Sequence, residues 1–296
     1  MTKQSSSDRR ADLIGSAFMV AAMAGFAVED VFIKAASQTL PVSQLLVLFG
    51  LGGALLFSAI ALANRENLLA PDAFSRPMRV RVFFEITGRL FFVLALAFTP
   101  LSTTTVILQA APLVVVAGAA LFFGEKVGWR RWLAIALGMV GVIIMVQPGA
   151  ESFSLLSLLA VIGMLGFAGR DLASRAAPAS LSTAVLGAHG FASIMLAGLL
   201  YALWERVPFV WPQPQAALFV CGAVLAGLVG YSSLMKAMRT GDVSAVTPFR
   251  YTRLLFGIAF GVVLFGEELS LAMLAGCGLI VCSGLFILWR GKKAGT

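Results

Sequence analysis

The chain has 296 residues and a formal net charge of +8; 59% of the residues are hydrophobic and only 12% are charged. Apolar runs of about 20 residues recur along it, which is the length that a helix needs to cross the hydrocarbon core of a bilayer. Backbone polar groups in lipid must be hydrogen-bonded within the crossing segment, so we expect helices and not strands. The composition therefore excludes an ordinary water-soluble domain and predicts an all-α membrane protein.

Ten apolar segments follow one another along the chain. The predicted membrane-spanning ranges are 13–37, 42–63, 80–99, 102–123, 130–147, 154–176, 181–203, 215–237, 244–265 and 270–289. They form two groups of five, so we predict one five-helix repeat over residues 13–148 and another over residues 154–289. Residues 1–12 and 290–296 are the expected terminal tails, both of them cytoplasmic.

The distribution of basic residues gives that orientation, because cytoplasmic loops retain Lys and Arg. Sixteen of them fall on one side of the predicted helices, against only Arg206 in the opposite loops, with Lys34 ambiguous. The sixteen are Lys3, Arg9, Arg10, Arg65, Arg76, Arg79, Arg81, Lys126, Arg130, Arg131, Arg175, Lys236, Arg239, Arg290, Lys292 and Lys293. The net charge is thus a topology signal, and we expect the lipid bilayer and not nucleic acid as the partner of these charges.

The chain also repeats itself. Residues 23–36 return as residues 164–177 with seven of fourteen positions identical, and the heptapeptide at 121–127 returns at 263–269. A repeat of five crossings must enter its second copy from the opposite side of the membrane, so the two halves are predicted to be inverted. Inverted repeats are typical of alternating-access transporters, which bind the substrate near the midplane between the repeats.

Charged side chains inside the predicted helices are the candidates for function. One helical face carries Met23, Phe26, Asp30 and Lys34, and the second half copies it as Met164, Phe167, Asp171 and Arg175. Because the halves are inverted, we expect Asp30 near the outer mouth of a pathway and Asp171 near the cytoplasmic mouth. The alternative is that each aspartate only pairs with its own basic residue one turn along, near the interface.

Arg89 lies near mid-depth, where an arginine is costly unless it faces protein or a water-filled cavity. Its partner is either Glu85, one turn earlier, or a substrate carboxylate, which a planar guanidinium binds well. At the cytoplasmic end we predict a gate in which Asp171 and Glu85 pair with Arg250 or Arg253. Breaking and remaking such pairs is a plausible two-state element.

Weaker signals remain open between function and packing. His189, the only histidine, either takes part in proton coupling or packs between helices. Tyr231 either contacts a substrate or bonds a helix backbone. Pro112 is expected to kink its helix, and Gly124-Glu125 and Gly266-Glu267 are interpreted as helix ends at which the acid starts the next helix. No metal-ligand cluster, nucleotide-binding loop or disulfide framework is predicted, and no cofactor.

The tract TPLSTTTV at 99–106, followed by Phe123-Gly124-Glu125 and by Gly138 and Gly141, resembles the EamA domain of the drug/metabolite transporter superfamily. The second copy runs from residues 240–248 to Phe265-Gly266-Glu267, so the resemblance covers nearly the whole chain. It implies ten helices around a central cavity in a bacterial inner membrane and transport of amino acids, other metabolites or toxic compounds. Within this family the chain is most similar to YddG-type amino-acid exporters.

We therefore expect an exporter of small organic solutes, most of all of amino acids including aromatic ones. Arg89 is assigned to a substrate carboxylate and Asp30 to an amine, with the first, third, fourth, sixth, eighth and ninth helices around the cavity. The other predicted substrate contacts are Phe26, Gln109, Phe167, Tyr231 and Tyr251. The alternatives are a transporter of drugs, other metabolites or lipids, and an intramembrane lipid-modifying enzyme.

Overall fold

A computed structural model of the protein describes residues 3–124, 128–146, 155–176, 178, 180–240 and 246–294. These ranges contain helices and no strand, as the composition predicts. The α-helices are α1 (Lys3–Ala36), α2 (Val42–Ala63), α3 (Arg76–Phe98), α4 (Leu101–Leu108), α5 (Ala111–Phe123), α6 (Trp129–Val146), α7 (Ser157–Arg175), α8 (Thr183–Glu205), α9 (Pro214–Thr240), α11 (Thr252–Phe265) and α12 (Leu271–Ala294). Two short 3-10 helices, η1 (Pro71–Phe74) and η2 (Thr247–Tyr251), join them.

Six helical spans of the described chain are long and apolar enough to cross a membrane. They are Arg10–Ala36, Val42–Ala63, Leu101–Phe122, Ser157–Ser174, Thr183–Glu205 and Pro214–Ala237, and two shorter apolar helices cover Trp132–Ile144 and Leu271–Phe286. Helix α3 is long enough but carries Arg81, Glu85 and Arg89 along its length, which lowers its hydropathy. An all-helical membrane protein is thus confirmed.

Two of the predicted crossings are interrupted helices. Between α4 and α5 the backbone turns at Gln109 and Ala110, whose N–H groups bond to carbonyls three residues back instead of four. Pro112 lies in the first turn of α5, where its missing N–H removes a helical hydrogen bond, so the predicted kink is confirmed as a break. In the second half η2 precedes α11 at the corresponding place. Such breaks expose backbone groups beside a cavity.

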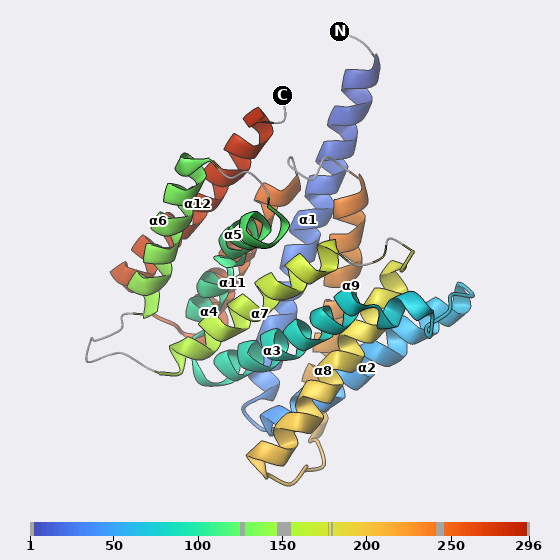
Figure 1. Ribbon diagram of the computed structural model, residues 1–296. Coiled ribbons are helices and arrows are strands. Elements are labelled where there is room, and N and C mark those ends of the chain that lie inside the picture. The colour runs from blue at the N-terminus through green and yellow to red at the C-terminus, as the bar shows by residue number, and fades with distance from the viewer. Residues whose placement is uncertain are drawn as a thin grey trace.

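Each half of the chain packs against the other, helix by helix. The main contacts join α1 to α9, α3 to α7, α2 to α8, α4 to α11 and α6 to α12. When each helix is replaced by its counterpart in the other half, the contact between α1 and α9 becomes the contact between α7 and α3. Each of the remaining contacts becomes itself. Figure 1 shows α6 beside α12 on one flank, α2 beside α8 on the other, and both chain termini at the same end of the bundle.

Glycines allow α1 to approach α9 closely, and α3 to approach α7. A Cβ on Gly25 of α1 would lie 3.0 Å from the Cα of Gly230 on α9. At the equivalent crossing, a Cβ on Gly166 of α7 would collide with the Cα of Gly88 on α3. Small residues at such crossings let helices in a membrane gain van der Waals contact. The outer surface is rich in exposed apolar side chains, among them Leu55, Leu218 and Val263, which suits contact with lipid.

Candidate substrate cavity

A cavity of about 380 Å³ lies between the two halves of the chain. Helices α1, α3, α7 and α9 line it together with the two interrupted segments, α4 with α5 and η2 with α11. These are the six helices expected from the sequence. A seventh wall, α8, was not expected and contributes Leu186, Gly187, Gly190, Phe191 and Ile194. Of its glycines, Gly190 faces the charged side chains of Arg81 and Glu85 on α3, whereas Gly187 faces the ring of Phe57.

The lining holds more basic than acidic side chains. The guanidinium groups are those of Arg81, Arg89, Arg170, Arg250 and Arg253, and the carboxylates are those of Glu29, Glu85 and Asp171. Asp30 stands directly behind Arg253 and adds a fourth carboxylate. Every one of these arginines has an acidic partner, as groups within a membrane require.

The deepest arginine is held by an acid from another helix. Nη1 of Arg89 lies 2.6 Å from Oε1 of Glu29, whose side chain is only 2% exposed. The guanidinium lies 5.2 Å from the ring centre of Phe49 and 5.7 Å from that of Phe167. Glu85, the partner on the same helix considered from the sequence, bonds other arginines instead. The Glu85 alternative is therefore not what the structure shows, because α1 brings a nearer carboxylate.

A second deep pair joins the two halves of the chain. Nη2 of Arg253 on α11 lies 2.6 Å from Oδ2 of Asp30 on α1, and its guanidinium lies 5.4 Å from the ring centre of Phe26 and 5.7 Å from that of Phe92. Arg253 therefore pairs with Asp30 and not with the acids of the predicted gate. Arg89 and Arg253 thus each contact two phenylalanine rings. One ring of each pair, Phe167 beside Arg89 and Phe26 beside Arg253, lies at the equivalent position of the two repeats.

The alternative that Asp30 pairs with Lys34 is also not what the structure shows. Nζ of Lys34 donates hydrogen bonds to the carbonyl oxygens of Leu96 at 3.1 Å and Thr99 at 2.7 Å. Lys34 thus ties α1 to the end of α3, one turn beyond Asp30. The side chain of Arg175, the basic residue proposed for Asp171, lies outside the described residues.

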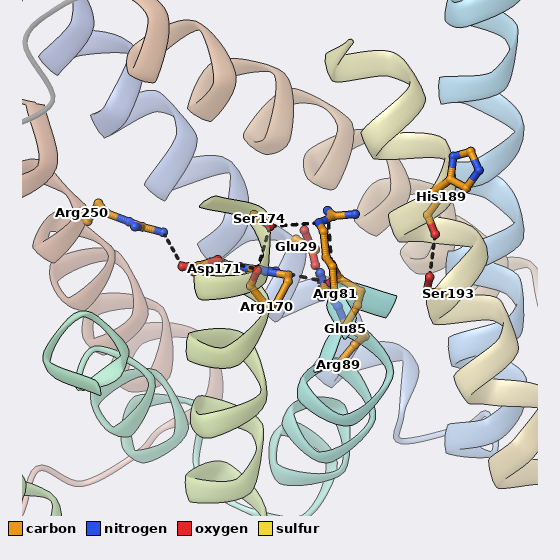
Figure 2. A network of polar contacts seen from close by, with 10 residues as sticks. All are labelled: Glu29, Arg81, Glu85, Arg89, Arg170, Asp171, Ser174, His189, Ser193 and Arg250. Atoms are coloured by element: carbon orange, nitrogen blue, oxygen red, sulfur yellow. Dashed lines mark hydrogen bonds and ion pairs between the residues drawn. The ribbon is translucent and has the colours of Figure 1, made fainter. Parts of the chain in front are cut away.

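Near the other end of α3, five charged side chains alternate in sign, and we call them the inner cluster: Arg250, Asp171, Arg170, Glu85 and Arg81 (Figure 2). The central guanidinium, that of Arg170, lies 2.8 Å from Asp171 and 3.3 Å from Glu85. At the two ends, Arg250 lies 3.6 Å from Asp171 and Arg81 lies 3.5 Å from Glu85. The structure brings Asp171 and Arg250 together as predicted for the gate, whereas Glu85 pairs with Arg170 and Arg81.

One side of the inner cluster is more exposed than the deep pairs. The side chains of Arg170, Asp171 and Arg250 are 24%, 26% and 30% exposed, whereas Asp30 is 1% exposed and Arg81 and Glu85, on the other side of the cluster, are each 6% exposed. Nε of Arg81 donates to Oγ of Ser174 at 3.1 Å, which fastens the start of α3 to the end of α7. The cavity therefore passes from a buried region near Glu29 to a more exposed region around Arg170, Asp171 and Arg250.

At the opposite end of the bundle, hydrogen bonds to a carboxylate join the two halves of the chain. The carboxylate of Glu267 accepts from the N–H groups of Leu101 at 2.5 Å and Ser102 at 2.9 Å, and from Oγ of Ser102 at 2.6 Å. Glu267 does not start the next helix, because α12 begins at Leu271. Instead it satisfies the free N–H groups at the start of α4, where a negative charge is also favoured by the helix dipole. Glu125, its counterpart, lies outside the described residues.

The remaining predicted contacts divide into two groups. Phe26, Gln109, Phe167 and Tyr231 line the cavity, and the side-chain amide of Gln109 donates to the carbonyl of Arg250 at 2.9 Å. Tyr251 and His189 do not line it. The hydroxyl of Tyr251 lies against Gly284 of α12, where a Cβ would collide with it. Figure 2 shows the ring of His189 directed away from the inner cluster, with Nδ1 3.0 Å from the carbonyl of Val185.

Three charged lining residues are not among the site residues expected from the sequence. Glu29 is visible in the sequence as a second acid beside Asp30 inside an apolar helix. Arg81 is counted with the topology charges, but α3 begins at Arg76, so Arg81 lies in its second turn. Arg170 stands next to Asp171 in the sequence, which gives no sign that it is the centre of the inner cluster.

Comparison with known proteins decides the family. The sequence profile of the EamA-like transporter family matches residues 13–147 and again residues 155–289. The chain belongs to this family. Members are multi-pass transporters of the bacterial inner membrane, and the protein is accordingly a transporter and not an enzyme.

Several characterised relatives of this EamA-like transporter carry named substrates. The chain is 29% identical to a riboflavin transporter of Vibrio cholerae over 73% of its own length and 72% of the relative's. It is 28% identical to an S-adenosylmethionine uptake transporter of Rickettsia bellii over 72% and 71% of the two lengths. It is 28% identical to the pseudopaline exporter CntI of Pseudomonas aeruginosa over 95% and 99%. None of the three is named as an amino-acid exporter, so the relatives support small-molecule transport in general.

A solved crystal structure shares the fold. It superposes with a TM-score of 0.63 over 95% of this chain and 98% of its own, at 22% sequence identity. At that identity the likeness concerns the arrangement of the helices alone. The arrangement of Figure 1 is therefore shared with an experimentally determined structure.

Proposed function

We propose that this EamA-like transporter exports small organic solutes, and amino acids in particular, by alternating access through the cavity between its two halves. The observation that carries the proposal is the lining itself, in which guanidinium groups, carboxylates and phenylalanine rings meet within about 380 Å³. Guanidinium groups recognise carboxylates, acids recognise amines, and rings recognise apolar side chains. All three are features of an amino acid.

The proposed topology is ten crossings in two inverted repeats with both termini in the cytoplasm. In support, α4 with α5 and η2 with α11 each form one crossing, and the helix pairs are exchanged or preserved when the halves are swapped. Both termini lie at the same end of the bundle (Figure 1), the end that carries the basic loops. The proposed units are the repeats 13–148 and 154–289 with the tails 1–12 and 290–296.

In this topology the end at which Glu267 joins the two halves is closed and faces outward, and the inner cluster faces the cytoplasm. The outward direction of transport is supported by the relative that matches nearly full length, which is an exporter. A substrate enters past the inner cluster, and the halves then rock so that the closed end opens. Exchange of ion-pair partners in the inner cluster is the proposed gate.

The proposed roles of the deep residues follow from their placement. Arg89 is the deepest site for a carboxylate, with Phe26, Phe167, Gln109 and Tyr231 around the rest of the substrate. Asp30 acts by holding Arg253 in place and not as a direct ligand of an amine, because its carboxylate lies behind that guanidinium. We assign no substrate contact to Tyr251 or His189 in this conformation.

A second candidate function is transport of one of the compounds named for the relatives. Riboflavin and S-adenosylmethionine are favoured by relatives that share more than 70% of the length, and pseudopaline by one that shares 95%. These compounds belong in the same experiment as the amino acids.

The test is uptake of radiolabelled solutes into proteoliposomes that contain the purified protein, with and without a pH gradient. The panel holds amino acids, riboflavin, S-adenosylmethionine and pseudopaline. Arg89→Ala is compared with Arg79→Ala, which alters an exposed arginine of the same helix. Saturable amino-acid entry that Arg89→Ala alone abolishes supports the proposal, and a gradient effect indicates proton coupling. Entry of a relative's compound but of no amino acid supports the second candidate instead.

A further inference from the structure

The inner cluster contains one more positive than negative charge. Three guanidinium groups, those of Arg81, Arg170 and Arg250, share the two carboxylates of Glu85 and Asp171. The deep pairs are balanced one to one at 2.6 Å, whereas the end members of the inner cluster lie at 3.5 Å and 3.6 Å from acids that Arg170 already holds. The cluster therefore begins and ends with an incompletely neutralised arginine.

At its Arg81 end the inner cluster borders the cavity, whose wall includes Arg81, Glu85, Ser174 and Gly190. The side chain of Arg81 is 6% exposed, and its buried Nη1 atom has no hydrogen-bond partner among the described residues. Gly190 of α8 stands opposite the guanidinium, where an added Cβ would meet Nη2 of Arg81 at 3.6 Å and Oε2 of Glu85 at 3.9 Å, both ordinary contact distances. A guanidinium that lines a cavity and keeps an unused donor is suited to an oxyanion.

Apolar side chains continue from this part of the cavity. Leu186 and Ile194 of α8 and Leu234 and Met235 of α9 line the same cavity. They offer a surface for a hydrocarbon body attached to the oxyanion. The arrangement differs from a site for an inorganic ion, which needs no such surface.

We propose that Arg81, with Ser174 beside it and Gly190 opposite, forms an oxyanion subsite. The transported solutes are then small organic acids that carry one more carboxylate than amine. The inference rests on the proposed transport function and narrows its substrate class. A solute carboxylate at this position completes the alternating row of charges and offsets its excess. A neutral zwitterion brings no net charge, and a cation adds to the excess.

The test uses pairs of solutes of nearly equal size that differ in one carboxylate: glutamate with glutamine, and aspartate with asparagine. Proteoliposomes containing the wild-type protein are expected to take up each acid faster than its amide. Arg81→Gln is expected to lower uptake of the acids by about 10-fold to 100-fold, the usual effect of losing a hydrogen bond to a charged group. The matched control is Arg79→Gln, which removes the same charge from an exposed position two residues away.

A second variant tests the space and leaves the charges intact. Gly190→Ala fits the empty protein, because its methyl group meets Arg81 and Glu85 at ordinary contact distances. It is expected to raise the KM for the acids by occupying the position of the carboxylate. Gly278→Ala on α12, which meets nothing within 4 Å, is its control.

Binding is measured separately from transport, as the shift in Tm that glutamate or inorganic phosphate produces in the detergent-purified protein. A shift lost in Arg81→Gln and kept in Arg79→Gln supports the subsite even where no solute enters liposomes, a result that counts against the transport proposal alone. A shift by phosphate only shows an oxyanion site without an organic substrate and overturns the substrate class. Equal uptake of acids and amides, unchanged by both test variants, overturns the proposal, as does the absence of both uptake and any Tm shift.

Discussion

The carboxylate of Glu29 on α1 lies 2.6 Å from the guanidinium of Arg89 on α3, and both side chains are almost fully shielded from water. The pair spans 60 residues of sequence and lies at the deep end of the substrate cavity. Because both side chains are buried, each charge depends on the other to remain there.

Removing one member of this pair should therefore destabilise the protein more than removing both. We expect Glu29→Gln to lower the free energy of unfolding by about 3–5 kcal/mol, since Arg89 is left buried and unpaired. Glu29→Gln with Arg89→Gln should recover a large part of that loss. Chemical denaturation of the four proteins in the same detergent gives the coupling energy. Additive losses would show that the two side chains do not stabilise each other.

The gate makes a corresponding prediction for transport. Asp171→Asn and Arg250→Gln are each expected to reduce the initial rate of uptake by about tenfold, the effect of about 1.4 kcal/mol. The double variant should retain more activity than either single one, because it restores the net charge that the wild-type inner cluster carries. Uptake into proteoliposomes is compared at equal protein density. If the double variant is as impaired as the single ones, this pair is not part of the gate.

Glu267 allows a test of the closed end. Glu267→Gln should weaken the hydrogen bonds to the start of α4 and cost about 0.5–2 kcal/mol, as for other helix caps. Glu268→Gln, an exposed neighbour, is the control and should have little effect. The readout is the rate at which a membrane-impermeant thiol reagent modifies Thr103→Cys in a protein whose three native cysteines are replaced. Faster modification only in Glu267→Gln is expected, and equal rates would remove Glu267 from the closure.

Close packing between the halves is tested at Gly166. A Cβ there collides with backbone atoms of Gly88, which have no freedom to move aside. We expect Gly166→Ala to destabilise the protein by about 1–3 kcal/mol, the range found for overpacked cores. Gly278→Ala, which adds a methyl group in open space, serves as control. A Tm of Gly166→Ala equal to that of the control would mean that α3 and α7 separate at little cost.

Local patterns predicted the helices and the walls of the cavity. Hydropathy gave the helical segments, and the repeated face of Phe26 and Phe167 marked two of the residues beside the deep arginines. Ion-pair partners were not predictable in this way. Asp30 and Arg253 are 223 positions apart, and only the packing of α1 against α11 brings them together.

Helix geometry explains the misplacement of Tyr251. The sequence predicts one α-helix over residues 244–265, but residues Thr247–Tyr251 form a 3-10 helix. Neighbouring side chains of a 3-10 helix are about 120° apart, so Tyr251 is directed about a third of a turn away from Arg250. Arg250 consequently reaches the cavity, whereas Tyr251 is directed to α12.

The hydrogen bonds of Glu267 lie across the bundle from the inner cluster and contact no cavity residue. In the proposed alternating-access cycle, these hydrogen bonds stabilise the conformation that accepts substrate from the cytoplasm. An apparent Kd equals the intrinsic Kd divided by the populated fraction of the competent state. Natural variation at Glu267 or Ser102 can therefore retune the apparent affinity for every substrate by the same factor while leaving the order of preference among substrates unchanged.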